Sequence, residues 1–449
     1  MRLWEGLQVH QGDVISLVGA GGKTTTMYRL GRELAQLGWR VVATTTTKIR
    51  PPSPEETEDV IVADEAEDMV LRVREALGPG QVVTVVAERL EDEGKLKGIP
   101  PYLAASLRQL ADAVIIEADG AKGLSLKAPA ADEPVVPVAT SIVVPVVGVD
   151  AVGCALTGRF VHRHELVAGI TGLAPGELIT VSTVASVLLH EQGALKGVPL
   201  QARVVPFVNK VHDEATLSTA RQIARRVKSH PSLDRVLIGA AAAADPVLEC
   251  WRRVSAVVLA AGGSTRFGRP KLLLPVAGKT MLEHVLAKVQ ATSVHEVVVV
   301  LGNAVEQLVG RVPEGCRWVC NERWQTGISS SIRVGLEAID RGAEAALFVL
   351  ADQPGITTAM VEQILQAYYG ATKAIVAPVY QRQRGTPVLF DRRLFPKLAA
   401  LHGDVGGREL LARCPEEVLP VEMSSAEVFL DVDVPADYER LDNGRAAMP

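Results

Sequence analysis

An apolar strand followed by a glycine-rich loop and a helix occurs twice in this chain, and this repeated opening constrains the fold more than any other feature. The first strand covers residues 14–18, and its loop leads into a helix expected over 24–37. The second strand covers 254–259, and a helix is expected later, over 281–289. Both strands are apolar without alternation, which is typical of strands buried on both faces of a parallel sheet.

The chain has 449 residues, more than one hydrophobic core usually organises, since a domain takes roughly 100–200 residues. After each opening, strand-like and helix-like segments alternate, and an alanine run at 240–244 separates the two halves. We therefore predict an α/β protein of two doubly wound domains. The N-terminal domain is expected over 1–250, a Rossmann-like C-terminal domain over 251–441, and a disordered tail over 442–449.

The composition excludes several classes of protein. Hydrophobic residues make up 48% and charged residues 22%, which fits a packed protein and not a disordered one. The formal net charge is −5, so no overall positive field recruits nucleic acid. Proline and acidic residues interrupt the apolar stretches, so no membrane span is expected, and no signal peptide is recognisable. The five cysteines form no CxxC pair, which suits free thiols in a reducing cytoplasm.

The richest functional signal is the loop after the second strand. Its small residues let backbone N–H groups approach an anion closely, while Arg266 and Lys271 would add positive charge against a triphosphate. The alternative is an ordinary glycine-rich turn with solvated basic side chains, which the joint spacing of small residues, arginine and lysine disfavours. The predicted nucleotide-binding residues of this loop are Leu259, Ala260, Ala261, Gly262, Gly263 and Ser264.

Two acids in the second half are candidates for binding Mg²⁺. Asp352 ends an apolar strand, which places it at the ligand edge of a sheet, and Asp433 lies in a second acidic stretch. Taken alone, each acid could instead cap a helix. Together with the loop, the pattern favours catalysis by positioning and charge neutralisation, with Arg266, Lys271 and Asp352 as catalytic residues.

The first loop opens a helix directly, which is the context that a phosphate-binding P-loop requires. Lys23 would contact the outer phosphates, while Thr24 and Asp119 would hold Mg²⁺. The loop is shorter than GxxxxGK[ST], so a glycine-rich helix start is the alternative. The acid of a guanine-reading NKxD motif falls one residue late, at Asp213, which leaves ATP and GTP equally open. The predicted nucleotide-binding residues are Gly19, Gly22, Lys23, Thr24 and Thr25.

The spacing of glycine, serine, arginine and lysine in 262–271 resembles that of the molybdenum cofactor nucleotidyltransferases, and the Ala-Ala-Gly start resembles their cytidylyltransferase branch. Stretches at 321–331, 384–390 and 403–408 extend the resemblance over nearly all of 254–438. It implies transfer of CMP from CTP to Mo-molybdopterin, with Mg²⁺, giving the cytosine dinucleotide cofactor and pyrophosphate. Thr386 departs from relatives that carry His or Asn there. The residues implied to line the pterin side are Asn321, Ser330, Arg384, Asp404 and Arg408.

The first half resembles the YqeC-type accessory proteins that are linked to selenium-dependent molybdenum hydroxylases. The matching residues lie at 19–25, 117–121, 162–163 and 209–210, together with Lys127 and Pro129. This resemblance implies a cytoplasmic maturation factor whose client is a molybdenum hydroxylase of the xanthine dehydrogenase type. His162, His164 and Glu165 could bind a metal, although a surface or hydrogen-bonded role suits them better without further ligands nearby.

Two other interpretations of function stay open. The acceptor of the nucleotidyl group could be another phosphomonoester, such as a sugar or polyol phosphate. Alternatively, the chain could be a non-catalytic cofactor-insertion chaperone whose nucleotide sites act as switches, an interpretation that applies mainly to the N-terminal half. Product analysis with each NTP and each acceptor separates these possibilities.

Overall fold

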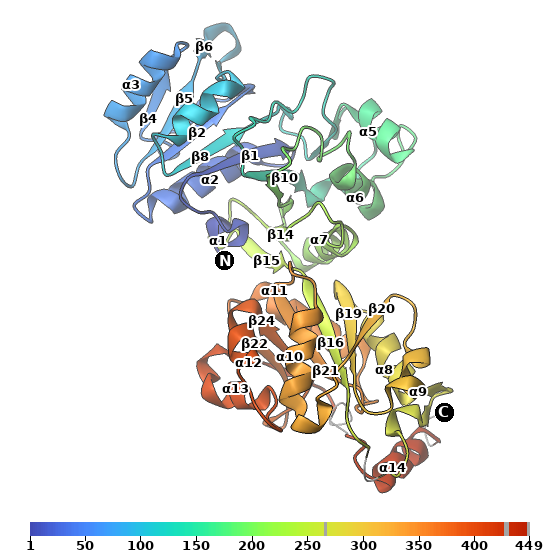
Figure 1. Ribbon diagram of the computed structural model, residues 1–449. Coiled ribbons are helices and arrows are strands. Elements are labelled where there is room, and N and C mark those ends of the chain that lie inside the picture. The colour runs from blue at the N-terminus through green and yellow to red at the C-terminus, as the bar shows by residue number, and fades with distance from the viewer. Residues whose placement is uncertain (265–266, 426–430, 447–449) are drawn as a thin grey trace. The chain divides into compact units, whose positions relative to one another are not determined.

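The computed structural model describes residues 1–264, 267–425 and 431–446 of the chain. Residue contacts divide the chain into two compact units, Met1–Trp251 and Arg252–Pro449, whose elements are labelled in Figure 1. Within the described residues, no helix is long and apolar enough to cross a membrane.

The first unit is built around a mostly parallel sheet with the strand order β15-β14-β13-β10-β1-β8-β2-β5-β4, in which β12 also pairs with β10. Only the pairing of β14 with β15 is antiparallel in this sheet as described. The strands are β1 (Asp13–Gly19), β2 (Val41–Thr45), β4 (Asp59–Val62), β5 (Val82–Val86), β8 (Ala113–Glu117), β10 (Ile142–Gly148), β12 (Arg203–Val204), β13 (Phe207–Asn209), β14 (Val236–Gly239) and β15 (Val247–Trp251).

Helices cover both faces of this sheet, as the continuous apolar strands predict (Figure 1). Alternate residues of β1 divide between the two faces: Ile15 belongs to the apolar cluster that includes Met27 and Leu30 of α2, whereas Val14 belongs to the cluster that includes Leu107 of α4. The helices are α1 (Leu3–Leu7), α2 (Lys23–Ala35), α3 (Ala66–Ala76), α4 (Ala104–Arg108), α5 (His164–Thr171), α6 (Val181–Leu189) and α7 (Glu214–Val227).

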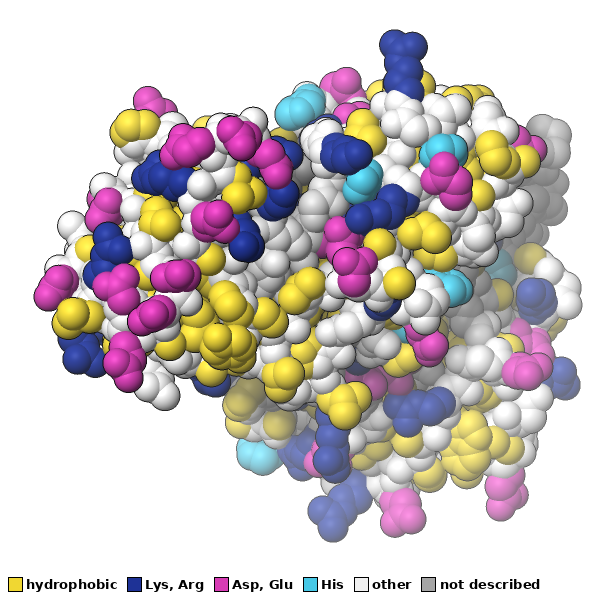
Figure 2. Space-filling view, turned by 90° about the horizontal axis from the view of Figure 1, so that it is seen from above, with side chains coloured by type: hydrophobic (Ala, Val, Ile, Leu, Met, Phe, Trp, Pro, Cys, Tyr) yellow, Lys and Arg dark blue, Asp and Glu magenta, His cyan; other side chains and the backbone are white. Residues whose placement is uncertain are grey.

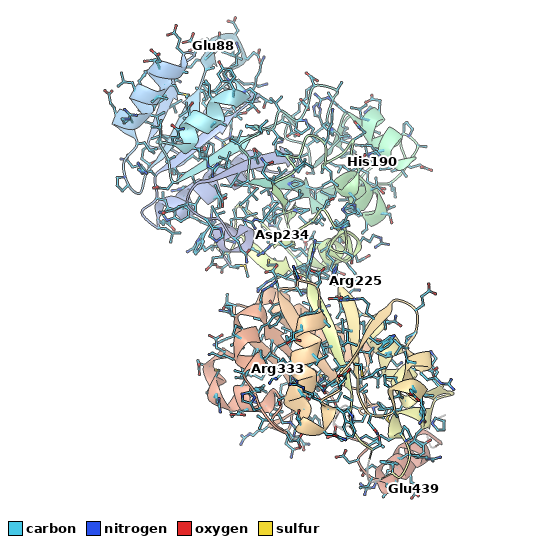
Figure 3. All side chains as sticks on the ribbon, in the orientation of Figure 1. Glu88, His190, Arg225, Asp234, Arg333 and Glu439 are labelled. Carbon is cyan, nitrogen blue, oxygen red and sulfur yellow. The ribbon has the colours of Figure 1, made fainter. Side chains whose placement is uncertain are left out.

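Two small sheets flank the main sheet of the first unit. The strands β3 (Lys48–Ile49), β7 (Lys95–Lys97) and β6 (Glu88–Leu90) form an antiparallel sheet, and β9 (Leu126–Lys127) pairs with β11 (Val161–His162). Glu88 and His190, which follows α6, lie at widely separated ends of this unit in Figure 3. The sequence pattern did not predict these short strands, because two or three residues carry no recognisable periodicity.

The second unit is built around a sheet with the order β20-β19-β16-β21-β24-β22-β23, in which β25 also pairs with β22. The strand predicted over 254–259 and the helix predicted over 281–289 are present as β16 and α8, within one residue of the expected bounds. The strands are β16 (Val254–Ala260), β19 (Glu296–Leu301), β20 (Cys316–Cys320), β21 (Ala345–Leu350), β22 (Ile375–Tyr380), β23 (Gln383–Arg384), β24 (Val388–Asp391) and β25 (Val418–Glu422). The helices of four or more residues include α8 (Met281–Gln290), α9 (Val305–Leu308), α10 (Ile328–Ala338), α11 (Thr358–Gly370), α12 (Phe395–Ala399), α13 (Arg408–Arg413) and α14 (Pro435–Ala446).

Two features of the second unit differ from the sequence expectation. The sheet is mixed, because β24 runs antiparallel to both β21 and β22. The chain between β22 and β24 is too short for the crossover of a dozen or more residues that a parallel pairing needs, so β24 returns antiparallel. Helix α14 continues to Ala446, past residue 442 where disorder was expected, since Pro435 suits a first helical position and alanine and arginine favour a helix.

Candidate functional site

The glycine-rich loop of the second unit and Asp352 meet at one edge of the sheet because of strand register. Leu259 of β16 lies opposite Leu350 of β21, so the loop after Ala260 and the turn after β21 leave the sheet side by side. Ser264 has a left-handed backbone, with φ of 47°, and its Oγ accepts a hydrogen bond of 3.1 Å from the backbone N–H of Lys271. This bond folds the loop back on itself and fixes the start of the Lys271 side chain.

Lys271 is the centre of the charged cluster at this edge. Its side chain is only 11% exposed, and Nζ donates to Asp352 Oδ2 at 2.7 Å, to Asp433 Oδ1 at 3.2 Å and to the Val432 carbonyl at 2.9 Å. Burial alone would lower the pKa of Lys271, but the charges and hydrogen bonds of Asp352 and Asp433 outweigh burial and raise it. Lys271 is therefore a fixed cation between two carboxylates, while Arg266 lies outside the described residues.

A hydrogen-bonded chain that the sequence did not predict leads away from Asp352. Gln353 Nε2 donates to Asp431 Oδ1 at 2.6 Å, and the hydroxyl of Thr386 donates to Gln353 Oε1. Burial raises the pKa of Asp431, and the nearby charges of Asp352 and Asp433 add to that effect against the hydrogen bond from Gln353. Thr386, the residue that departs from the resembling family, thus orients an amide beside the acidic cluster.

Two adjoining pockets open beside this cluster, and both are lined by Leu259, Ile328, Leu350, Asp352 and Asp404. The first, of about 510 Å³, also has Ala261, Gly262, Gly263, Trp324 and Ser331 in its wall. The second, of about 460 Å³, also has Thr386, Arg408, Asp431 and Asp433 in its wall. Four of the six predicted loop residues are therefore brought together with Asp352, Asp404 and Arg408 around one connected depression, as a site for an elongated ligand requires, whereas Ala260 and Ser264 line neither pocket.

Three of the residues expected on the pterin side have structural contacts instead. Asn321 is 2% exposed, and its Nδ2 donates to the hydroxyls of Ser330 at 2.8 Å and Ser331 at 2.9 Å. The hydroxyl of Ser330 in turn donates to the Gly327 carbonyl at 2.8 Å. Arg384 lies on β23, where Nη1 donates to the Leu411 carbonyl at 3.1 Å. Asn321 and Ser330 shape the turn that carries Trp324, and none of the three lines either pocket.

The turn before α10 is held against a second loop by glycine. Gly327 has φ of 106°, and a Cβ at this position would lie 2.3 Å from the carbonyl carbon of Gly403. Ser329 Oγ donates to the Gly403 carbonyl at 2.7 Å, and the N–H of Ile328 donates to Asp404 Oδ1 at 3.4 Å. Arg333, labelled in Figure 3, extends the attachment by donating to the Leu401 carbonyl at 3.0 Å. This close approach places Asp404 in the walls of both pockets.

The first-unit loop has the close backbone packing that a phosphate-binding loop needs. Gly19, Gly21 and Gly22 all have left-handed backbones. A Cβ on Gly21 would lie 2.2 Å from the backbone nitrogen of Gly148, so only glycine fits there. Asn209 Nδ2 donates to the Gly21 carbonyl at 2.7 Å, and its Oδ1 accepts from the N–H of Ala241 at 2.8 Å. Asn209 thus holds the glycine-rich loop in place.

The lysine and acids predicted around this loop are in contact. Lys23 is buried, and its Nζ lies 3.0 Å from Asp119 Oδ1 and 3.8 Å from Glu117 Oε1. Thr24 Oγ1 donates to Glu117 Oε2 at 2.7 Å, so Glu117, which the sequence analysis did not select, is the acid next to that hydroxyl. Burial raises the pKa of Glu117, opposed by attraction to Lys23 and by the hydrogen bond from Thr24.

Asp213 caps a helix, and His164 contacts the neighbouring glutamate. Asp213 caps α7, since its Oδ1 accepts from the N–H of Thr216 at 2.8 Å, which leaves it a structural acid. His164 Nδ1 lies 3.3 Å from Glu165 Oε2. In the ranges that the structure describes, no group of three or more His, Cys, Asp or Glu side chains is arranged to hold a metal ion.

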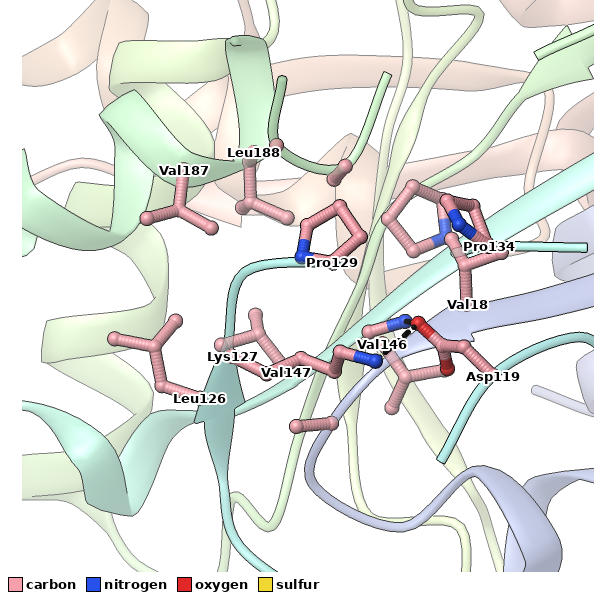
Figure 4. Close-up of a pocket in the computed structure, with 15 residues that line it drawn as sticks. Val18, Asp119, Leu126, Lys127, Pro129, Pro134, Val146, Val147, Val187 and Leu188 are labelled. Carbon is pink, nitrogen blue, oxygen red and sulfur yellow. Dashed lines mark hydrogen bonds and ion pairs between the residues drawn. The ribbon is translucent and has the colours of Figure 1, made fainter. Parts of the chain in front are cut away.

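A buried lysine connects the loop acids to the outer part of the unit. Lys127 is 0% exposed, and Nζ lies 3.0 Å from Asp119 Oδ2 and 2.7 Å from Glu133 Oε2. Figure 4 shows the contact between Lys127 and Asp119 inside a small cavity walled by Pro129 and Pro134 and by Val187 and Leu188 of α6. Glu133 also accepts from both terminal nitrogens of Arg163.

Comparison with known proteins gives a separate match for each unit. Residues 256–418 match the MobA-like NTP transferase domain, and residues 15–165 match the YqeC protein family. The YqeC protein of Escherichia coli is 35% identical over 199 residues, which cover 44% of this chain and 75% of that protein. Nicotine blue oxidoreductase of Paenarthrobacter nicotinovorans is 34% identical over 197 residues, which cover 42% of this chain and 96% of that protein.

Solved structures of mycobacterial proteins are also similar. The Rv0371c homologue of Mycobacterium sp. strain JC1 is 34% identical, covers 44% of this chain and 98% of that chain, and has a TM-score of 0.40. Rv0371c of Mycobacterium tuberculosis in complex with manganese is 30% identical, covers 42% of this chain and 97% of that chain, and has a TM-score of 0.38.

Proposed function

Since the chain belongs to the YqeC proteins through its first unit and to the MobA-like NTP transferases through its second, we propose that the second unit transfers CMP from CTP to Mo-molybdopterin. The products are the cytosine dinucleotide form of the cofactor and pyrophosphate. In this proposal the first unit binds ATP or GTP at Lys23 and serves the maturation of a molybdenum hydroxylase of the xanthine dehydrogenase type.

The observation that carries the proposal is the position of Lys271, which is fixed between Asp352 and Asp433 beside the glycine-rich loop. The acceptor is a phosphate monoester whose second pKa is about 6, so it is mostly a dianion at neutral pH and needs no general base. One of its oxygens forms a bond to the α-phosphorus of CTP, and the bond to the bridging oxygen of the β-phosphate breaks. Lys271 neutralises the developing charge on the departing pyrophosphate, and Ala261 and its neighbours leave room for the triphosphate.

A divalent cation fits the chemistry of the two acids. Asp352 and Asp433 supply carboxylate oxygens on one side of the pockets, and Mg²⁺ commonly takes one or two protein carboxylates and completes its shell with phosphate and water. Bound there, it would neutralise phosphate charge. The side chains that the chain contributes to the acceptor are Asp404 and Arg408, which line the pockets, and the hydrogen-bonded Gln353 and Thr386 beside them.

The test is pyrophosphate release by the full-length protein with Mo-molybdopterin, Mg²⁺ and each NTP in turn. CTP should be the preferred substrate, and Asp352→Asn should lower kcat by about 100-fold or more, as the loss of a charge-stabilising group does in enzymes. Asp340→Asn, in the same unit but outside both pockets, is the matched control and should keep full activity. Faster pyrophosphate release with GTP than with CTP would show that guanine, and not cytosine, is the preferred base.

The acceptor and the type of reaction need their own controls. If pyrophosphate were released with a sugar or polyol phosphate but not with Mo-molybdopterin, the acceptor would be a sugar or polyol phosphate and the proposed acceptor would be wrong. One similar protein is named as an oxidoreductase, so nucleotide binding alone does not test the proposal and the products must be measured. If no combination of NTP and acceptor released pyrophosphate, the proposed nucleotidyl transfer would be refuted.

A further inference from the structure

The pocket beside the first-unit loop is larger and more basic than the phosphates of one nucleotide require. Its volume is about 1060 Å³, slightly above the roughly 300–1,000 Å³ that small-molecule sites occupy. Among the described residues that line it, seven are Lys or Arg and three are Glu, in a chain whose net charge is −5. Figure 2 shows Lys and Arg side chains around a hollow in the face it presents, with His side chains nearby. The seven are Lys23, Lys48, Arg50, Lys95, Lys122, Arg163 and Lys210.

Most of these cations already have an anionic partner. Lys48 pairs with Glu93 and Arg50 with Glu56, and Lys210 Nζ lies 2.9 Å from Asp150 Oδ2. Lys95 and Lys122 differ, because both are exposed and neither has a salt bridge or a side-chain hydrogen bond to any described residue. Two cations without a salt bridge or hydrogen bond to any described residue therefore face the pocket in addition to the lysine of the P-loop-like turn. Of the two, Lys95 is close enough to Glu93 to help lower the pKa of that carboxyl.

Arg163 adds a third charge whose position is fixed. It has a left-handed backbone, with φ of 57°, and its guanidinium is held by Glu133 on two nitrogens. Glu133 is shared with Lys127, and Asp119 is shared between Lys127 and Lys23. Arg163, Lys127 and Lys23 thus alternate with Glu133 and Asp119 in one chain of contacts, which Glu117 ends at Lys23. This chain of contacts is balanced in charge, so the positive excess of the pocket comes from the exposed lysines.

The charges of Lys122 and Arg163 act on the same place in the pocket. His162 lies there, and burial lowers its pKa, with the positive charges of Arg163, Lys127 and Lys122 lowering it further. The imidazole is therefore neutral at neutral pH and adds no counter-charge. An anionic group of a ligand would supply the counter-charge that Lys122 lacks and would lie near the guanidinium of Arg163, which Glu133 holds in place.

We propose that this pocket binds a second, phosphate-bearing small molecule beside the nucleotide, with Lys122 and Arg163 as its main cationic contacts and Lys95 as a further one. A planar guanidinium and an unpaired ammonium suit the oxygens of a phosphate monoester. The inference goes beyond the proposed function because it gives the first unit a second binding site, for a phosphate-bearing molecule. It rests on the proposed function only in assuming that a nucleotide binds at Lys23.

The experiment is equilibrium dialysis of the full-length protein with labelled inorganic phosphate, with and without saturating Mg²⁺ and a non-hydrolysable ATP or GTP analogue. Wild type should still bind phosphate when the analogue is bound. Lys122→Ala and Lys95→Ala should each weaken that binding about tenfold, which corresponds to about 1.4 kcal/mol, because each removes a charged hydrogen-bond donor to the phosphate. Lys97→Ala is the matched control, because Lys97 lies on the same strand, is exposed, pairs with Glu88 and does not line the pocket.

The outcomes separate this site from the proposed nucleotide site. Displacement of phosphate by the analogue, or equal effects of Lys95→Ala, Lys122→Ala and Lys97→Ala, would overturn the second site. The protein could instead bind no nucleotide and still bind phosphate in a way that depends on Lys122. That result would support the second site and refute nucleotide binding at Lys23. Comparison among the variants removes any contribution from phosphate held in the second unit.

Discussion

Replacing Lys127 by methionine tests whether the charge network of the first unit is held by its buried centre. The side chain of Lys127 is 0% exposed, and Nζ contacts Asp119 at 3.0 Å, Glu133 at 2.7 Å and the Gly120 carbonyl at 2.7 Å. Methionine keeps the length and apolar volume of the side chain but removes its charge. Asp119, which is 2% exposed, and Glu133 would then be left with one cation fewer inside the unit.

The magnitude follows from burial. Removing one partner of a buried ion pair costs about 3–5 kcal/mol, because the remaining charge stays desolvated without compensation. An exposed pair contributes about 0–1 kcal/mol. Lys97→Met removes such an exposed pair, with Glu88 at 3.0 Å, and serves as the control. We therefore expect Lys127→Met to destabilise the first unit by about 3 kcal/mol or more, and Lys97→Met to change it by less than about 1 kcal/mol.

Hydrogen exchange read by mass spectrometry suits a protein of two units, whose overall unfolding is not a single transition. Peptides from β1 and β8 report the opening of the first unit, and their slowest amides should exchange about 100-fold faster in Lys127→Met, since 1.4 kcal/mol is tenfold. Peptides from β16 and β19 should be unchanged. If the exchange of β1 in Lys127→Met matched that in Lys97→Met, the network would not be a stabilising element and the reasoning would be refuted.

Three further predictions concern single contacts. Asn321→Ala should lower the stability of the second unit by about 2 kcal/mol, seen in exchange of β20 peptides, because buried hydroxyl partners are left unpaired. Gly327→Ala should raise the KM for CTP several-fold with little change in kcat, measured by pyrophosphate release, since its Cβ would push the Gly403 loop away; an unchanged KM would contradict this. For Glu133, burial raises the pKa but Arg163 and Lys127 lower it to about 2, so its stabilisation is present above pH 4.5 and is lost as pH falls toward 2. Denaturation of wild type and Glu133→Gln should therefore converge on acidification.

The sequence was sufficient to predict the elements that have long apolar runs or clear helical periodicity. The strand β16 was expected near its observed position because residues 254–259 form an almost continuous apolar segment, whereas the short strands β23, β24 and β25 were not expected. Lys271 and Asp352 were also identifiable, since a loop and a strand end at the same sheet edge must be neighbours. The mixed character of the sheet could not be predicted, because β24 is only four residues long and its direction depends on the length of the connection before it.

Contacts between distant segments explain what the sequence missed. Gln353 and Asp431 meet across 78 positions, and nothing local to either residue indicates the other. Glu117 was passed over for Asp119, although Glu117 is the acid that accepts from Thr24. Asn321 and Ser330 fit a binding motif by residue type alone, but polar side chains in a buried turn also satisfy one another, and only geometry distinguishes these two uses.

The lysines of both proposed nucleotide sites, Lys23 and Lys271, are already neutralised by two acids each. A bare anion arriving at either lysine must displace carboxylates that are left without a counter-ion, so it gains little. A metal-bound triphosphate brings a cation for the acids and an anion for the lysine, and the exchange keeps every charge paired. In the proposed function, the resting ion pairs would therefore favour metal–nucleotide complexes over chloride and free phosphate at these two lysines.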